Sequence, residues 1–449
     1  MQTISSNTII MPKEYQVTFF KFFFIFVALF LWVTCFPPSI FAKTQAPKIE
    51  WQRSYGGRNR DNPTSAQKTL DGGYIIAGES YSNNSAYSLA NKDIWIVKVD
   101  QLGKIQWHQN FGGSESEIVS SILVSEGGYI IIGASESSDG DLDFNRGYFD
   151  AWIIKLDRLG NLAFTKNFGG SNRDYFSSIQ QTADGGFIVA GNSNSKDGDV
   201  TGNHGEKDFW IIKFDQQGNI QWKKCLGGSK EDVANSILIT SDNGFIIAGY
   251  SQSKDGDVTE NHGNADIWIV KLNTLGFIQW QKSFGGSRWD SANSILETST
   301  GDFIIAGESK SNDGDVTENH GSHDFWIVKI DSQGNLLKQK SYGGNYSDTP
   351  YAILETSDMG FIIAGKSDSE DGDITENLGG DDIWLIEIDD QLNLRWQKNF
   401  GGSNDEAAVS ILDTLDEGFI IVGPSSSYDG DVRTKNHGTN DFWFVKFKR

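Results

Sequence analysis

Cysteine and proline are scarce in this chain of 449 residues, which contains only 2 Cys and 7 Pro. Cys35 lies in an apolar stretch near the N-terminus and Cys225 has no second cysteine in the rest of the chain, so we expect no intrachain disulfide. Helix-favouring residues do not dominate, and the 50 glycines show no triplet period, which excludes a coiled coil and collagen. The 29 Phe, 14 Trp and 13 Tyr beside so many glycines predict an all-β chain.

Positive charge is also in short supply. Lys and Arg total 38 against 60 Asp and Glu, for a formal net charge of −22. The first 46 residues carry three lysines and one glutamate, a net +2, so the remainder carries −24. Such a field repels phosphate groups. The sequence therefore predicts no nucleic-acid partner and no docking on an anionic membrane surface.

The chain has one long apolar run, from Phe22 to Phe36, and it follows Lys21. This run is short for a membrane span, which needs about 20 residues, and it suits the apolar region of a signal peptide. Small residues suitable for cleavage follow at Ala42 and Ala46. We expect residues 1–46 to be a signal peptide, or alternatively an uncleaved N-terminal anchor. Residues 47–449 are then exported, which means secreted, periplasmic or on the cell surface.

Two sequence markers repeat along the rest of the chain. A double glycine stands at Gly56, Gly112, Gly169, Gly227, Gly285, Gly343 and Gly401, counting the first glycine of each pair. An Asp-x-Trp motif keeps the same interval, beginning at Asp93, Asp150, Asp208, Asp266, Asp324, Asp382 and Asp441. Seven units of about 58 residues indicate a propeller, a solenoid or an array.

Each unit contains four short strand patterns and no helical period. In one unit these are Ser294–Thr298, Phe303–Ala306, Asp324–Ile330 and Asn335–Tyr342, with a long polar loop from Ser309 to His323. Four strands per unit are typical of a propeller blade. The last unit stops after its third strand, and Ile49–Tyr55 matches a spare fourth strand. The sequence predicts a seven-bladed β-propeller of four-stranded blades, closed by an N-terminal strand that completes the last blade.

The unit Gly-Gly-Ser-x-x-Asp, Asp-Gly-Gly-Phe-Ile-Ile-Ala-Gly and Asp-x-Trp-Ile-Val-Lys resembles the repeats of uncharacterised secreted bacterial β-propellers. The resemblance covers about residues 49–449 and implies the fold, but no activity. Lys98–Trp107 is also similar to the tryptophan-docking turn of quinoprotein propellers, which typically have eight blades. Phe-Gly-Gly at the start of a unit resembles the FG-GAP repeats of integrins, whose calcium loop joins the first two strands. Here that connection is a tight turn.

Six of the seven long loops contain Asp-Gly-Asp. The pairs are Asp139/Asp141, Asp197/Asp199, Asp255/Asp257, Asp313/Asp315, Asp371/Asp373 and Asp429/Asp431, and the first unit has Asn83–Asn84–Ser85 instead. Carboxylates two residues apart can offer oxygen ligands to Ca²⁺, for example at Asp197, Asp199, Asp255, Asp257, Asp313 and Asp315. They can also form Asx turns that satisfy the backbone of the loop. We expect turns, with Ca²⁺ as the alternative.

No catalytic residue stands out. His204, His262, His320 and His437 all precede a glycine, but they are a blade apart and cannot share one zinc ion. There is no phosphate-binding loop, Ser/His/Asp set or Cys/His cluster. The sequence favours a binding module for an extracytoplasmic protein or glycan. The alternative is a propeller enzyme, either a quinoprotein-like oxidoreductase or a glycan-cleaving enzyme.

The candidate ligand site lies in the links that join one unit to the next. Each double glycine is followed by a small or polar residue, a variable pair and an acid. The acid recurs, so it is structural, whereas the pair differs from unit to unit. Arg288–Trp289 is one such pair, and Tyr346 belongs to the next. Exposed Trp, Tyr and Arg are enriched in binding hot spots and can stack on sugars. Arg288, Trp289 and Tyr346 are therefore the candidate ligand-binding residues, and the alternative is that Trp289 covers a neighbouring loop.

Overall fold

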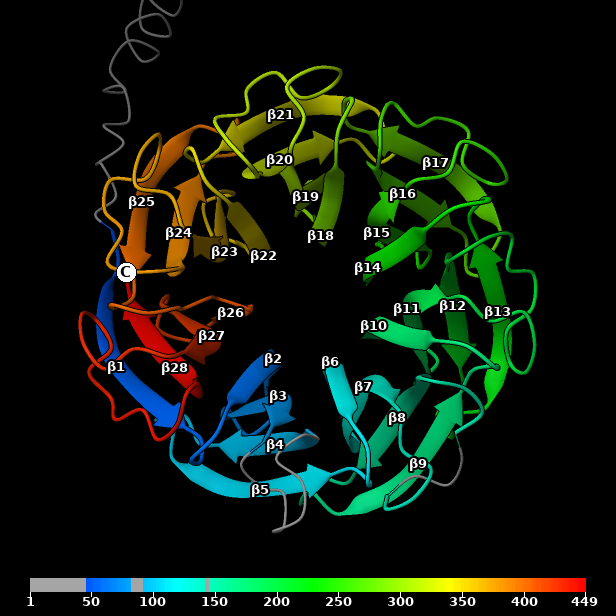
Figure 1. Cartoon of the computed structure of the whole chain (residues 1–449), viewed down its shortest axis with the longest axis horizontal. Coiled ribbons are helices and arrows are strands. Elements are labelled where there is room, and N and C mark those ends of the chain that lie inside the picture. Colours follow the sequence, from blue (N-terminus) through cyan, green and yellow to red (C-terminus); the bar gives the residue numbers. More distant parts are fainter. Residues whose placement is uncertain (1–45, 82–91, 142–144) are drawn as a thin grey trace, which may run out of the picture. The chain divides into compact units, whose positions relative to one another are not determined.

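A computed structural model describes residues 46–81, 92–141 and 145–449 and arranges them as seven four-stranded antiparallel sheets in a ring (Figure 1). The described residues form 28 strands and no α-helix. Within these ranges no helix exists that could cross a membrane. The prediction of an all-β seven-bladed propeller is confirmed. Residues 1–45 of the predicted leader and Asn83–Asn84–Ser85 lie outside the described residues.

Blade 5 shows how one repeat folds. Its strands are β18 (Asp290–Glu297), β19 (Phe303–Ser309), β20 (Asp324–Ile330) and β21 (Leu336–Tyr342), hydrogen-bonded in that order. In Figure 1 β18 lies toward the centre of the ring and β21 forms the outer rim. The predicted start of the first strand, Ser294, is wrong by four residues. A bulge between Ala292 and Ser294 lets the pairing continue back to Asp290, which pairs with Ser309.

The other complete blades repeat the same strand order. Blade 1 is β2 (Asp61–Lys68), β3 (Tyr74–Ser80), β4 (Asp93–Val99) and β5 (Ile105–Phe111). Blade 2 is β6 (Glu117–Ser125), β7 (Gly128–Ser135), β8 (Asp150–Leu156) and β9 (Leu162–Phe168). Blade 3 is β10 (Asp174–Gln181), β11 (Phe187–Ser193), β12 (Asp208–Phe214) and β13 (Ile220–Leu226). Blade 4 is β14 (Asp232–Ile239), β15 (Phe245–Ser251), β16 (Asp266–Leu272) and β17 (Ile278–Phe284). Blade 6 is β22 (Asp348–Glu355), β23 (Phe361–Ser367), β24 (Asp382–Ile388) and β25 (Leu394–Phe400).

Blade 7 contains both ends of the described chain. β1 (Lys48–Tyr55) pairs antiparallel with β28 (Asp441–Lys448), and β27 (Phe419–Ser425) and β26 (Ser410–Asp413) complete the sheet. In Figure 1 the blue strand β1 lies beside the red strand β28. The Gln52 side chain fixes this contact, because its Oε1 accepts from Trp443 Nε1 at 3.0 Å and its Nε2 donates to the Asp431 carbonyl at 2.9 Å. The predicted closure by the N-terminal strand is confirmed.

The Asp-x-Trp tryptophans bury their rings between neighbouring blades. Trp268 of β16 is fully buried, and its ring centroid lies 4.5 Å from that of Phe209 in the preceding blade. Its Nε1 donates to Gln281 Oε1 in β17 at 2.7 Å, so the only polar atom of the ring is satisfied. Burial of so large a side chain stabilises the packing of two neighbouring sheets, and the same packing can recur at every junction. These tryptophans are scaffold, as the sequence indicated.

A second set of tryptophans packs at the outer rim against glycines of the next blade. An added Cβ on Gly334, whose φ is +79°, would lie 2.9 Å from the Trp280 ring. Glycine is needed here for both the left-handed turn and the close approach. At the next junction Lys338 replaces the tryptophan, and the turn position holds the buried Leu392 with a φ of 54°. At this junction both the outer-rim tryptophan and the turn glycine that it would contact are replaced.

Removal of the closing strand should destabilise the whole ring. A chain that starts at residue 56 lacks Trp51 and Tyr55, and Tyr55 is only 6% exposed. The loss of buried aromatic side chains and the opening of a sheet edge should lower the free energy of unfolding by about 4 kcal/mol or more. A chain that starts at residue 47 is the control. Equal melting temperatures for the two chains would contradict the closure.

Candidate functional site

The two faces of the ring differ in the length of their connections. Strands alternate in direction, so the connections between first and second and between third and fourth strands lie on one face, the turn face. The long loops between second and third strands, the B–C loops, lie on the opposite face together with the D–A links that join blades. We call this the loop face. Long loops on a rigid scaffold are the usual place for binding residues.

The Asp-Gly-Asp loops hold the D–A links by backbone hydrogen bonds. In blade 5 the Ser287 N–H donates to Asp313 Oδ1 at 2.7 Å, and the Gly285 N–H donates to Asp315 Oδ2 at 3.1 Å. Gly314, between the two acids, has a φ of +65°, which favours glycine. The same first bond occurs at Asp139, Asp197, Asp255, Asp371 and Asp429, and the second at Asp141, Asp199, Asp257 and Asp373. In blade 5 these carboxylates therefore accept from a link 26 or 30 residues earlier in the chain, and not from their own loop as in the predicted Asx turns. The turn of the loop itself is closed by the backbone, because the Val316 N–H donates to the Asp313 carbonyl at 3.1 Å.

Turn formation and calcium binding lead to different results in solution. The carboxylates at Asp197, Asp199, Asp255, Asp257, Asp313 and Asp315 already accept from backbone N–H groups. Within the described residues no group of three His, Cys, Asp or Glu side chains is placed to hold a metal ion. We expect thermal unfolding in millimolar Ca²⁺ and in excess EDTA to give coincident curves. A rise in melting temperature with Ca²⁺ would establish the calcium alternative, because a ligand stabilises the state that binds it.

Two carboxyl groups meet at each D–A link, and at least one of the two is buried. Asp290, the recurring acid, accepts from the Gly286 N–H and the Ser311 hydroxyl at 2.8 Å each, and also from the Ser309 hydroxyl. Asp266 of the preceding blade accepts from the His262 N–H at 2.7 Å through Oδ2. Its Oδ1 has no hydrogen-bond partner among the described residues. Both acids are 0% exposed. The recurring acid is thus structural, in agreement with the prediction.

Glycine allows the two carboxyl groups to approach each other. An added Cβ on Gly285 would lie 2.7 Å from Asp290 Oδ2 and 3.0 Å from Asp266 Oδ1. The other junctions carry the pairs Asp93/Glu117, Asp150/Asp174, Asp208/Asp232, Asp324/Asp348, Asp382/Glu406 and Asp441/Asp61. Burial, which disfavours ionisation, raises the pKa of several of these groups: to about 6 for Asp93, Asp150, Asp232 and Asp348, and to about 7 for Asp382.

The histidines of the loop face contact these acids. In four blades the imidazole Nδ1 lies within hydrogen-bond distance of the Asp that begins the third strand, as at His262 and Asp266, where the distance is 2.6 Å. Leu378 takes the histidine position at Asp382, where only the backbone N–H donates. Each histidine therefore serves its own turn, and the four do not converge.

The raised pKa values predict that stability falls as the pH rises. These carboxyl groups bind protons more tightly in the folded chain than in the unfolded chain, so protonation stabilises the fold. This contribution to the free energy of unfolding is complete near pH 4 and is lost as the pH rises through 6 to 7. We expect the free energy of unfolding to drop by roughly 2 kcal/mol or more between pH 5 and pH 8. Urea unfolding at each pH measures this free energy.

Two substitutions distinguish the effect of a buried carboxyl group on stability from that of an exposed one. Asp382→Asn removes an ionisable group whose pKa is about 7, so it should reduce the pH dependence of the free energy of unfolding. Glu370→Gln, on an exposed loop position, should leave it unchanged. A protein that gains stability between pH 5 and pH 8 would contradict the assignment.

The predicted ligand-binding residues are all on the loop face but have different surroundings. Arg288 is exposed, and Tyr346 is 59% exposed on the next link. Trp289 is half-buried, because its ring packs against Tyr250 of the preceding blade with centroids 4.7 Å apart. A backbone bridge also joins Trp289 to Ala265. The three residues therefore share a face and not a single pocket.

Several loop-face residues were missed by the sequence reasoning. Tyr250 supports Trp289, and the Phe149 and Tyr175 rings pack 5.4 Å apart in the same manner between blades 2 and 3. Lys310 follows β19 directly and lines a cavity with Arg288. All of these positions vary from blade to blade. A comparison of the units at every position, rather than in the links alone, would have found them.

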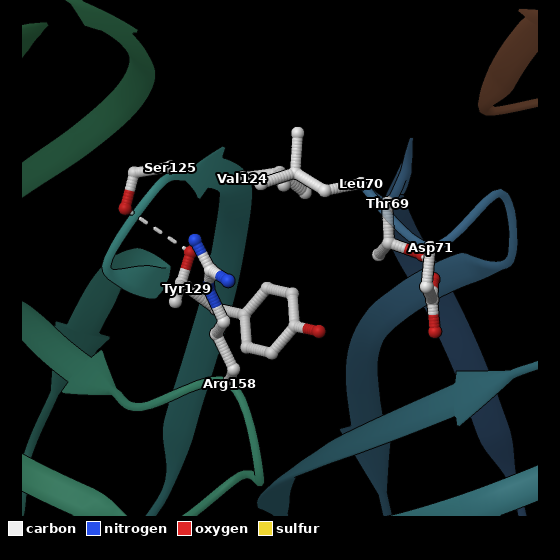
Figure 2. A pocket seen from close by; sticks show the side chains of 8 residues that line it. Thr69, Leu70, Asp71, Val124, Ser125, Tyr129 and Arg158 are labelled. Carbon is white, nitrogen blue, oxygen red and sulfur yellow. Dashed lines mark hydrogen bonds between the residues drawn. The ribbon is translucent and has the colours of Figure 1, made fainter.

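The turn face has cavities of another kind. One, of about 240 Å³, lies between blades 1 and 2; Figure 2 shows Leu70 and Asp71 on one side and Val124, Tyr129 and Arg158 on the other. In most blades a lysine of the third strand forms an ion pair with an acid of the turn, as Lys98 Nζ does with Asp71 Oδ2 at 3.0 Å. Partial burial raises the pKa of Asp71, but the hydrogen bond from Thr69, the contact with Lys98 and the Gly73 N–H outweigh it and hold that pKa at about 2.

The only cysteine in the described ranges offers no nucleophile. Cys225 is buried in β13, and burial raises the pKa of its thiol to about 12. The thiolate, which is the reactive form, is therefore scarce at neutral pH.

Known proteins match this chain at low sequence identity. No protein-family model matches the chain. Regulatory protein FlaEY of Caulobacter vibrioides is 26% identical over 281 residues, which are 57% of this chain and 28% of that protein. The chain therefore spans less than a third of that relative's length. Among solved structures, Sqt1 from Chaetomium thermophilum has a TM-score of 0.45 at 10% identity, with 88% of this chain and 87% of that chain covered.

Proposed function

We propose that this protein is an exported, non-catalytic propeller that binds an extracytoplasmic protein or glycan on its loop face, and that it is one of the secreted bacterial repeat propellers that its units resemble. The observation that carries this proposal is the distribution of residues that differ between blades. The scaffold residues recur at the junctions, whereas aromatic and basic side chains occur singly on the loop face. A scaffold does not require such residues.

The chemistry of the non-repeating residues suits binding. The Arg173 guanidinium lies 5.8 Å from the ring centroid of Tyr148, which is 65% exposed, and Tyr346 is nearly as exposed. Exposed Tyr, Trp and Arg are enriched at the centres of interfaces, and their flat faces stack on sugar rings. A module that acts by binding also fits a relative whose name describes it as regulatory. The apolar run at Phe22–Phe36 supports the export part of the proposal, because it suits the apolar region of a signal peptide.

A search for ligands with the chain from residue 47 tests the proposal. Glycan arrays and capture of proteins from the surface of the source cells should give a ligand. Trp289→Ala should then weaken binding by about 2 kcal/mol or more. Its melting temperature should stay close to that of the parent, because the Trp289 side chain is only half-buried.

A turn-face variant is the matched control. Leu102 is 66% exposed on the opposite face, so Leu102→Ala should leave ligand binding unchanged. Loss of binding with Leu102→Ala and not with Trp289→Ala would move the site to the turn face. A large loss of stability in Trp289→Ala would instead assign Trp289 to the scaffold.

A further inference from the structure

The loop face of blade 5 contains a cavity of about 360 Å³ between its D–A link and its B–C loop. The side chains that line it include Arg288, Lys310, Asn312, Asp313, Asn319 and His320. The lining is polar, and it brings two basic side chains together in a chain with a net charge of −22.

The two basic side chains form no ion pair with the scaffold within the described residues. Two other lysines of the loop face pair with acids: Lys207 lies 2.8 Å from Glu231 and Lys366 lies 2.7 Å from Asp381. Within the part of the chain that the structure describes, neither Arg288 nor Lys310 has a carboxylate oxygen within ion-pair distance. Hydrogen bonds from Ser287 lower the pKa of the Asp313 carboxyl and the charge of Arg288 lowers it further, but no ion pair within the described residues holds either basic side chain.

Blade 5 is the only blade that has a basic residue at both positions. The position of Arg288 is taken in the other links by Asn59, Glu115, Asn172, Lys230, Tyr346 and Asn404. The position of Lys310, directly after the second strand, is taken by Tyr81, Glu136, Asn194, Gln252, Asp368 and Ser426. The common scaffold thus has no need for this pair of cations.

The backbone around the cavity is held in place before any ligand arrives. The Arg288 N–H donates to the Ser311 hydroxyl at 3.0 Å, and the Lys310 N–H donates to the Trp289 carbonyl at 2.8 Å. On the opposite wall the Asn319 amide donates to the Ser309 carbonyl at 2.7 Å. A preformed wall lowers the entropy lost on binding.

The size and polarity of the cavity define a class of ligand. About 360 Å³ is the volume of roughly a dozen water molecules. One hexuronate has about that number of non-hydrogen atoms, so a single sugar ring fits. Arginine and lysine suit a carboxylate or a sulfate. Asp313 and Asn312 can bind hydroxyl groups, and His320 contacts Asp324 through Nδ1, which leaves Nε2 for the same purpose.

We infer that this cavity binds an acidic sugar, either a uronate or a sulfated hexose. The inference rests on the proposed function and deepens it, because it names the ligand class and the blade. One acid, Asp313, lies in the cavity itself, where Arg288 partly offsets its charge. The acids elsewhere on the protein oppose such a ligand only weakly, since the Debye length at physiological salt is about 8 Å.

Calorimetric titration of the chain from residue 47 with tetragalacturonate tests the inference. Its methyl ester has the same rings without the charge, and a galactose tetrasaccharide bearing sulfate esters distinguishes sulfate from carboxylate. We expect one of the two acidic tetrasaccharides to bind and the methyl ester to bind at least tenfold more weakly. Arg288→Ala and Lys310→Ala should each reduce the affinity at least tenfold. Lys230→Ala, the same link position in blade 4, should leave it unchanged.

The possible outcomes separate this inference from the proposed function. No binding of either acidic tetrasaccharide, or equal binding of the methyl ester, would overturn the acidic-sugar site. Binding that both Arg288→Ala and Lys310→Ala retain would overturn its location in blade 5. A neutral glycan or a protein captured on the loop face would still support the proposed function in each case. Thermal unfolding of each variant shows that it is folded.

Discussion

Each blade junction depends on one buried carboxyl group. In blade 5 Asp290 accepts from a backbone N–H of the incoming link and from two serine hydroxyls of its own blade. A buried polar backbone group without a partner is costly, so this acid lets a glycine-rich link enter the ring close to its neighbours. The same link is held from outside by Asp313 and Asp315. The link and the loop are therefore positioned together.

This arrangement has an electrostatic cost. A second buried acid, Asp266, faces Asp290 across Gly285, and one of its oxygens has no hydrogen-bond partner among the described residues. Burial then favours the protonated forms, which is why the pKa values at the junctions lie above those of exposed carboxyl groups. Histidines contact the first acid in four blades and partly offset the cost.

A repeated scaffold makes exceptions informative. Because every blade must solve the same packing problem, a residue that occurs once has a reason of its own. At the outer rim the reason is local packing, since Lys338 and Leu392 replace a tryptophan and a glycine at one junction. On the loop face, Arg288 and Lys310 have no ion-pair partner in the described ranges, so packing does not account for their charge. That contrast supports a binding role for the loop face.

The sequence by itself determined the number of blades, the closing strand and the bounds of the third strand, because these follow from local periodicity and from two markers repeated seven times. It did not determine the start of the first strand, where a bulge at Ala292 extends the pairing to Asp290. Only the tertiary structure placed Tyr250 under Trp289 and Lys310 beside Arg288. Each pair joins residues from different strands or blades. Their proximity depends on how the sheets pack around the ring, which no local pattern records.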